Sequence, residues 1–417
     1  MKIPIQPLSL LLASALVASA DSNLVVAPDP GTLIFSNLIQ PGVPTNKVDA
    51  EHYFQNQLDL ASKQRHAKCP DLAAQILVNI LETNAAPEFK RKALFELALA
   101  TQDNNELVRA QQVFSQYLQR YPEDVSVPEV LLRQGMLYRQ MGVTTLAISK
   151  FYAVMSTALK LNLSNIDYYK NLVLQAQTEI ADTYYYLGHF NESADFYARL
   201  LKTDSPSLDK QQIDFKLIRS LSYLTNCNDT ISRAESFLTN FPDYPDSPEV
   251  RFILASADKA VGHNADALKQ VLLLLQSQQK NAQSNPDMWA YWQRRAGNEI
   301  ANQLYKEGDY LDALQIYQNL ASLDSATAWQ APALYQVGLV YEQLQQWQRA
   351  TDTYDQILAR RSEMTATNAE PSLASLYEMA QWRKDYIVWL QKARAANLGF
   401  QRTYLYKPSM TNATASR

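Results

Sequence analysis

The sequence predicts an all-α fold: a superhelical solenoid of about eight helical hairpins, closed by a C-terminal capping helix. Three observations predict this architecture. Glycine is scarce, at 10 of 417 residues. Small residues recur in pairs twelve positions apart, and a bulky apolar residue follows each pair at a fixed distance. Sheet-rich folds and nucleotide-binding α/β folds need more glycine than this for tight turns and phosphate-binding loops.

Residues 1–20 have the pattern of a cleavable secretory signal. Lys2 supplies the positive charge, Leu8–Val17 the apolar stretch, and Ala18–Ala20 a cleavage site of small residues. The mature chain is then predicted to begin at Asp21. No cysteine follows the apolar stretch to carry a lipid, and no later run is long enough to cross a membrane. The sequence therefore predicts a periplasmic or secreted protein without a lipid anchor or a transmembrane helix.

Residues 49–361 are predicted to form the repeat array. The stretch Ile300–Tyr317 shows the pattern plainly, because one helix ends at Gly308, a turn follows, and a second helix begins near Tyr310. A small residue in the first helix and another twelve positions later mark the place where the two helices cross closely. The predicted pairs are Ala61 and Ala73, Ala98 and Ala110, Gly135 and Ala147, Ala181 and Ser193, Ser222 and Ala234, Ala255 and Ala267, Ala301 and Ala313, and Gly338 and Ala350.

The position four residues after each second small residue tests this alignment, since it was not used to make it. It is always apolar or aromatic, as a groove-filling residue must be: Leu77, Phe114, Phe151, Tyr197, Leu238, Val271, Tyr317 and Tyr354. The predicted turn residues are Gly142, Gly188, Gly262 and Gly308, with Asn105 and Asp229 in two further units, and Lys68 and Gln345 depart from the pattern. The wider spacings, at 160–173 and 276–295, predict lengthened helices.

This combination of small, groove-filling and turn residues resembles the tetratricopeptide repeat (TPR) family. The phrases Phe114–Pro122 and Phe237–Pro242 look like the helix endings of bacterial envelope TPR proteins, of the outer-membrane assembly and Tol-Pal-associated types. The resemblance implies a scaffold that binds other proteins. It constrains the fold more tightly than the function, because one repeat fold serves many activities.

Two segments flank the predicted array. Residues 21–48 are rich in proline and are predicted to form an extended leader. Residues 362–400 are predicted to form a further helical pair or a single long helix, which carries Trp382 and Trp389 seven positions apart on one face and caps the last hydrophobic face of the array. Residues 401–417 are polar and are predicted to be a disordered tail.

The sequence carries little that indicates catalysis or a cofactor. Neither phosphate-binding glycine pattern is present, and the two cysteines and four histidines lack zinc-ligand spacing. A formal net charge of −4 gives no electrostatic reason to bind nucleic acid. We therefore expect no enzyme activity, no cofactor, no metal site and no nucleic-acid partner. Cys69 and Cys227 fall in hairpins far apart and are predicted not to bond to each other.

The inner face of the solenoid is the predicted partner-binding surface. Residues one and four positions after the first-helix small residue should point into it, and tyrosine and asparagine are well represented there. The candidates are Asp182, Tyr185, Tyr186, Tyr223, Asn226, Asn298, Asn302 and Tyr305. The alternative is that such tyrosines belong to the hairpin core. Some cytosolic TPR domains hold a peptide C-terminal carboxylate with two Asn and three Lys or Arg residues. Asn298 and Asn302 are present here, but the next unit offers Pro332 and Gln336 where the cations would be needed, which disfavours such a role.

The predicted function is a non-enzymatic, exported TPR scaffold that mediates protein–protein interactions in the cell envelope. The alternative is a glycan-binding module whose tyrosine-rich groove stacks on sugar rings, because a tyrosine ring is flat, apolar and tipped by a hydroxyl.

Overall fold

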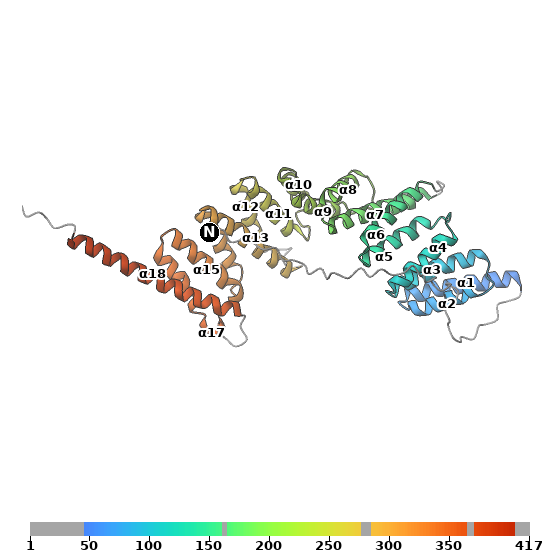
Figure 1. The fold of residues 1–417 in the computed structure, drawn as a ribbon, viewed down its shortest axis with the longest axis horizontal. Coiled ribbons are helices and arrows are strands. Elements are labelled where there is room, and N and C mark those ends of the chain that lie inside the picture. Colours follow the sequence, from blue (N-terminus) through green and yellow to red (C-terminus); the bar gives the residue numbers. More distant parts are fainter. Residues whose placement is uncertain (1–45, 161–164, 277–284, 365–370, 405–417) are drawn as a thin grey trace, which may run out of the picture.

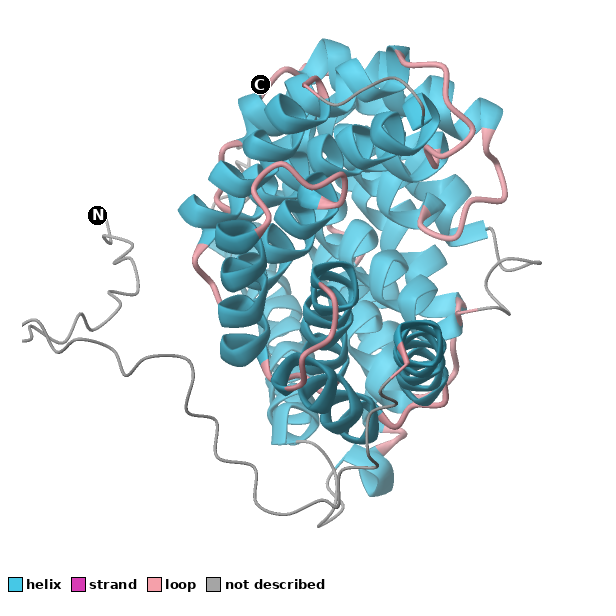
Figure 2. Ribbon diagram, turned by 90° about the vertical axis from the view of Figure 1, so that its right-hand side faces the viewer, coloured by secondary structure: helices cyan, strands magenta, loops and turns pink. Residues whose placement is uncertain are grey.

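The computed structural model describes residues 46–160, 165–276, 285–364 and 371–404, drawn in colour in Figure 1. Within these ranges it contains eighteen α-helices and no strand, and Figure 2 shows only helices and connecting loops. The predicted all-α solenoid is therefore confirmed. The signal segment 1–20 and most of the predicted leader lie outside the described residues.

Sixteen of the helices form eight consecutive antiparallel hairpins along an elongated array (Figure 1). In chain order the hairpins are α1 (Lys47–His66) with α2 (Pro70–Glu82), α3 (Pro87–Asp103) with α4 (Leu107–Arg120), α5 (Val127–Gln140) with α6 (Thr144–Ala158), α7 (Ile166–Tyr186) with α8 (Phe190–Lys202), α9 (Lys210–Tyr223) with α10 (Cys227–Asn240), α11 (Ser247–Ala260) with α12 (Asn264–Gln276), α13 (Pro286–Glu307) with α14 (Tyr310–Ser322), and α15 (Thr327–Gln343) with α16 (Trp347–Leu358). The short α17 (Arg361–Met364) and the long α18 (Pro371–Tyr404) follow.

Each hairpin turns at one residue with positive φ, and these turn residues show a longer period. Lys68, Gly188 and Gly308 are separated by 120 residues each, as are Asn105, Thr225 and Gln345, and also Gly142 and Gly262. The second helices α2, α8 and α14 likewise begin 120 residues apart. Three hairpins are therefore the true repeat of this chain. We call α1–α6 module 1, α7–α12 module 2 and α13–α18 module 3.

Each module opens with a long helix. α1, α7 and α13 contain 20, 21 and 22 residues, whereas the other hairpin helices have 12 to 17. The predicted lengthening at 160–173 and 276–295 is confirmed for the described parts of α7 and α13. Residue matches recur at the same period, for example Glu179-Ile180-Ala181 with Glu299-Ile300-Ala301.

The fifth hairpin departs from its predicted register by four residues. Ser222 is exposed, whereas Ile218 and Thr230 are buried where the helices cross, and Thr225 rather than Asp229 is the turn residue. In this hairpin the large residue stands on the first helix and the small residue on the second, the reverse of the arrangement in the other hairpins. A large Ile218 is accommodated because Ala234 stands at the groove-filling position, which holds the larger Tyr197 in the fourth hairpin and Val271 in the sixth.

Close helix contact explains why glycine stands at the crossing elsewhere. A Cβ atom added to Gly135 would lie 2.5 Å from Cε1 of Phe151, and one added to Gly338 would lie 2.5 Å from Cε1 of Tyr354. Both rings are fully buried. The small residue of the first helix is thus matched in size to the groove-filling residue sixteen positions later.

The capping helix α18 packs on α16 and α15 in the place that α5 and α11 occupy in modules 1 and 2. Its buried stripe is Leu373, Ala380 and Ile387. Trp382 and Trp389 lie outside this stripe, because they are 60% and 61% exposed. The helix ends at Tyr404, so it reaches into the predicted tail, of which 405–417 lies outside the described residues.

Candidate functional site

The predicted partner-binding residues fall into two groups in the structure. Tyr185 and Tyr186 lie at the end of α7, beside Tyr223 at the end of α9. Asn298, Asn302 and Tyr305 lie on α13, whereas Asp182 lies on α7. Asn226 was predicted on a first helix but precedes α10 in the turn, where its amide donates to Oδ2 of Asp229 at 2.5 Å. That displacement follows from the four-residue register error in the fifth hairpin.

An aromatic cluster forms where α7 ends, α8 begins and α9 ends. Phe190 stacks on Tyr223 with ring centroids 4.3 Å apart, and Tyr185 meets both rings edge-on at 5.5 and 6.1 Å. Tyr186 contacts Tyr185 and is 78% exposed, while Tyr223 is 58% exposed. We call Tyr185, Tyr186, Phe190 and Tyr223 the tyrosine cluster. Phe190 was missed because it opens a second helix, whereas the prediction considered only positions on the first helices.

Arg219 places a positive charge beside the tyrosine cluster. Its guanidinium lies 5.3 Å from the centroid of the Tyr185 ring, a cation–π distance, and its Nε lies 2.9 Å from Oε1 of Glu249. Burial, helped by Tyr223 and Glu249 and opposed by Arg219, raises the pKa of Tyr185 to about 12. Tyr185 is therefore neutral at physiological pH and presents a hydroxyl that can donate a hydrogen bond.

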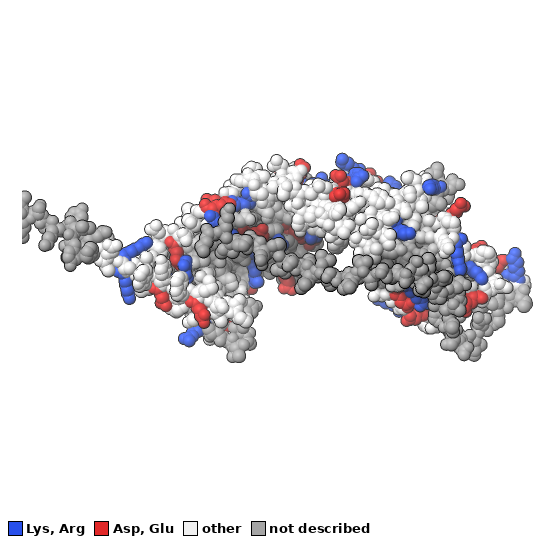
Figure 3. Space-filling view, viewed as in Figure 1, with Lys and Arg blue, Asp and Glu red and all other residues white. Residues whose placement is uncertain are grey.

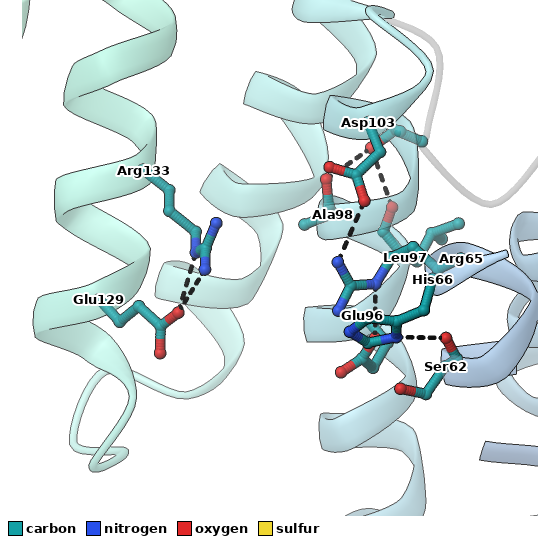
Figure 4. Close-up of polar contacts among 10 residues, drawn as sticks. Ser62, Arg65, His66, Glu96, Leu97, Ala98, Asp103, Glu129 and Arg133 are labelled. Atoms are coloured by element: carbon teal, nitrogen blue, oxygen red, sulfur yellow. Dashed lines mark hydrogen bonds and ion pairs between the residues drawn. The ribbon is translucent and has the colours of Figure 1, made fainter. Parts of the chain in front are cut away.

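Module 1 shows that the fold does not need tyrosines at this place. The residues 120 positions before Tyr185 and Tyr223 are Arg65 and Asp103, and they form an ion pair with Nη1 and Oδ2 3.0 Å apart (Figure 4). Arg65 also donates to Glu96 at 3.2 Å. Charged side chains thus lie at these helix ends in module 1, whereas exposed aromatic rings lie there in module 2.

Asp182 forms hydrogen bonds with other residues of the same chain. Its carboxylate accepts hydrogen bonds from the Tyr197 hydroxyl and, at 2.8 Å to both oxygens, from Nζ of Lys216. These contacts join α7, α8 and α9 behind the tyrosine cluster. The equivalent residue of module 3, Asn302, accepts a hydrogen bond from Tyr317 at 2.6 Å. Burial raises the pKa of both Tyr197 and Tyr317, so both hydroxyls remain donors.

The second group lines a cleft of about 540 Å³ on α13. Asn298 and Asn302 belong to it, together with Tyr291, Arg294, Arg295 and Glu299, which the prediction missed. The prediction sought cations on the next hairpin, but Arg294 and Arg295 precede Asn298 by one turn of the same helix. Arg294 also lies 4.5 Å from the ring centroid of Trp329 on α15.

Tyr305 does not extend this cleft. It is half-buried, packs against the hydrophobic core of module 3, and meets Tyr310 edge-on with centroids 5.5 Å apart. The alternative interpretation of such tyrosines, as part of the hairpin core, therefore describes Tyr305 better than it describes Tyr186 or Tyr223.

Other kinds of site are not evident in the described part of the chain. No group of three or more His, Cys, Asp or Glu side chains there could hold a metal ion. None of its helices combines the length and apolarity needed to cross a membrane. Both cysteines are free. In the face seen in Figure 3, charged side chains are scattered in small patches of both signs over a mainly uncharged surface.

Comparison with known proteins agrees with the repeat assignment. A sequence model of the tetratricopeptide repeat family matches residues 332–362, which include most of α15 and all of α16. The eighth hairpin is thus a TPR, and the array has the TPR-type helical-hairpin fold. The chain matches none of the curated proteins.

Several solved structures are similar to this chain. The C-terminal part of a TPR repeat-containing protein from Cytophaga hutchinsonii is 14% identical, with a TM-score of 0.49, over 64% of this chain and 95% of that one. A TPR protein from Parabacteroides merdae is 14% identical, with a TM-score of 0.40, over 70% and 98%. The apo form of RapI is 10% identical, with a TM-score of 0.46, over 82% and 99%.

Proposed function

We propose that this protein is a non-enzymatic scaffold that binds a partner protein through the tyrosine cluster, and that it does so in the cell envelope. A TPR-type array encloses no pocket within one hairpin, so binding depends on surfaces shared by neighbouring hairpins. The tyrosine cluster is such a surface, because α7, α8 and α9 each contribute a side chain to it.

The observation that carries the proposal is the difference between equivalent positions. Tyr185 and Tyr223 stand where module 1 has the Arg65–Asp103 ion pair. An exposed aromatic cluster costs solubility without adding core, and exposed apolar patches mark interaction sites. Tyrosine anchors are also among the residues that contribute most to protein–protein affinity.

The envelope location is supported by the signal pattern at residues 1–20. Cell fractionation of the native organism, with sequencing of the mature N-terminus, tests it directly. We expect the protein in the periplasmic or secreted fraction, beginning at Asp21. A cytoplasmic protein that retains Met1 or Lys2 would contradict the location without affecting the binding proposal.

Partner binding is tested with the double variant Tyr186→Ala/Tyr223→Ala, which removes the two most exposed rings of the cluster. Envelope extract is crosslinked to the wild type and to each variant, and captured proteins are compared by quantitative mass spectrometry. The matched control is Tyr152→Ala, which removes an exposed tyrosine from the second helix α6. We expect one protein captured by the wild type and by the control but lost from the double variant.

The captured protein is then purified and its affinity measured by calorimetry. Two truncated anchors should weaken binding by about 2 kcal/mol or more each. Equal affinities for wild type and double variant would exclude the tyrosine cluster as the binding surface. A glycan array run in parallel tests the alternative ligand, and tyrosine-dependent binding there without any protein partner would replace the proposal.

A further inference from the structure

The capping helix α18 carries an exposed aromatic stripe. Its members are Met379, Trp382, Tyr386 and Trp389, and the two tryptophans are the most exposed of them. Trp382 stacks on Tyr386 with centroids 5.6 Å apart and planes 7° apart, and Tyr386 stacks on Trp389 at 6.0 Å. The spacing of three, four and three residues is the heptad spacing of a helix that packs along another helix.

The hydrophobic stripe that holds α18 to the array is a different one. Leu373, Ala380 and Ile387 are buried against the last hairpin, and Arg383 and Lys384 pair with Glu342 and Asp355 of α15 and α16. Capping is therefore complete without the aromatic stripe. Figure 1 shows the second half of α18 extending past α15, so much of its length lies outside the hairpin array.

In modules 1 and 2 the corresponding surface is covered by the next module. α5, α11 and α18 can be aligned on the proline of their first turn, which is followed two residues later by a buried apolar residue. In this alignment Trp382 corresponds to Arg139 and Lys259. Arg139 pairs with Glu179 of α7, and Lys259 pairs with Glu307 of α13. Trp382 thus stands where a long helix of the next module would pack.

Helix α1 of a second copy lacks the apolar residues needed to pack on this exposed face of α18. α7 and α13 pack on the preceding module with large apolar residues, among them Leu172 in α7 and Trp289 and Trp292 in α13. The equivalent positions of α1, 120 residues before Leu172 and 240 residues before Trp289, hold His52 and Asp49. A head-to-tail contact would therefore bury polar groups of α1 against aromatic rings, at a cost in desolvation.

We propose that the aromatic stripe of α18 binds the same stripe of a second copy, in an antiparallel pair related by a two-fold axis. The two faces are then identical and both apolar, as an isologous interface requires. A parallel pair would place both arrays at the same end of the joined helices, where they would compete for space. An antiparallel pair centred near Tyr386 places Trp382 opposite Trp389 of the second copy.

Charge supports the antiparallel register. Glu378 precedes the stripe and Lys392 follows it, and both lie near the edge of the exposed face. In an antiparallel pair centred near Tyr386, Glu378 of each copy lies near Lys392 of the other. A parallel pair would leave Glu378 of one copy about 21 Å along the helix from Lys392 of the other and would lack these two attractions. The antiparallel register also places Asp385 of each copy opposite Asp385 of the other, so one repulsion is set against two attractions.

The first test is the mass of the purified protein by light scattering and sedimentation at about 10 µM, where a micromolar dimer is substantially populated. We expect a dimer for the wild type and a monomer for Trp382→Glu/Trp389→Glu. The matched control is Tyr186→Glu/Tyr223→Glu, which adds the same charges to the other exposed aromatic cluster and should leave the dimer intact. A monomeric wild type, or a dimer that persists in the tryptophan variant, would overturn the proposal.

The second test fixes the register by disulfide trapping, in a background where Cys69 and Cys227 are replaced by serine. The double variant Glu378→Cys/Lys392→Cys should form a covalent dimer on mild oxidation, whereas Glu378→Cys alone should not. Efficient crosslinking of Glu378→Cys alone would indicate parallel helices and reject the antiparallel pair. Circular dichroism of each variant checks that α18 remains folded.

Discussion

Modules 1 and 2 use one backbone plan with two kinds of side-chain chemistry. At the helix ends, Arg65 and Asp103 in module 1 correspond to Tyr185 and Tyr223 in module 2. The difference recurs inside the second hairpin. In module 1 the Tyr117 hydroxyl donates to Asp124 at 2.7 Å, and Asp124 pairs with Arg91. In module 2 the equivalents of Tyr117 and Asp124 are Phe237 and Tyr244, which pack edge to face at 5.2 Å.

This comparison separates what the fold requires from what a function can use. Positions that differ in chemistry but keep the backbone are free of the packing constraint, so the exposed rings of module 2 need another explanation. Positions at the helix crossings behave differently, because a change on one helix is matched on the other. The predictions below test these two kinds of position, beginning with the largest expected effect on stability.

Phe114→Ala should lower the free energy of unfolding by about 3–5 kcal/mol, because it empties a fully buried groove between helices. The fifth hairpin shows how the loss can be offset, since Ile218 there faces Ala234. Ala98→Ile/Phe114→Ala copies that pair and should recover part of the loss. Urea denaturation followed by circular dichroism measures both. A double variant less stable than Phe114→Ala would show that bulk cannot be exchanged between these helices.

Gly135→Ala should destabilise, although alanine is favoured over glycine within a helix by about 1 kcal/mol. The added Cβ would lie 2.5 Å from the Phe151 ring, and overpacking of this kind typically costs about 1–3 kcal/mol. The equivalent pair of module 2 is Ala255 and Val271. In a Phe151→Val background the same Gly135→Ala change should become stabilising. An unchanged sign would mean that the ring does not exclude the methyl group.

The repeat fold was predictable from sequence because seven of the eight hairpins keep the small residue on the first helix. The fifth was misaligned since Ile218 and Ala234 reverse the sizes, and Ser222 satisfied the small-residue pattern by chance. The 120-residue period is already present in the predicted turn residues, at Lys68, Gly188 and Gly308 and at Gly142 and Gly262, and only the fifth hairpin broke it. In the candidate site, Tyr185 follows from the spacing rule because it stands four positions after Ala181, whereas Tyr223 was selected through the misaligned register. The contacts of Phe190 with both α7 and α9 had no such signal.

The capping helix shows a different limit of sequence patterns. Its stripes 373–380–387 and 382–389 have the same seven-residue spacing, so spacing alone does not say which one packs on the array. The actual core stripe uses Leu373, Ala380 and Ile387, because α18 approaches α16 too closely for an indole at the position of Ala380, which is fully buried.

Acid should weaken module 1 more than module 2 at the second hairpin. Burial opposes ionisation of Asp124, but hydrogen bonds from Tyr117 and Ser126 and the charge of Arg91 outweigh it and lower its pKa. A lowered pKa in the folded state contributes stability above the unfolded value of about 4, and this is lost as pH falls through the folded pKa.

Hydrogen exchange between neutral pH and acid, read by mass spectrometry, measures this difference. Protection of α4 and α5 should fall before protection of α10 and α11, where Tyr244 replaces the carboxylate. Asp124→Asn should lower stability at neutral pH and flatten the acid dependence. Equal loss of protection in both modules would show that Asp124 does not govern the acid response of module 1.

The smallest effect on stability is expected where the two modules differ most visibly. Tyr185→Arg/Tyr223→Asp transfers the ion pair of module 1 to module 2, and exposed ion pairs contribute only about 0–1 kcal/mol. The melting temperature should change little, because the Arg65–Asp103 ion pair occupies the equivalent helix ends in module 1. Capture of the partner protein should nevertheless weaken strongly, since two of the four rings of the tyrosine cluster are gone, the exposed Tyr223 among them. The reciprocal change, Arg65→Tyr/Asp103→Tyr, should leave capture unaltered and serves as the matched control. A large fall in melting temperature for the first variant would mean that the tyrosines are core residues of module 2, and that the comparison with module 1 does not identify a binding surface.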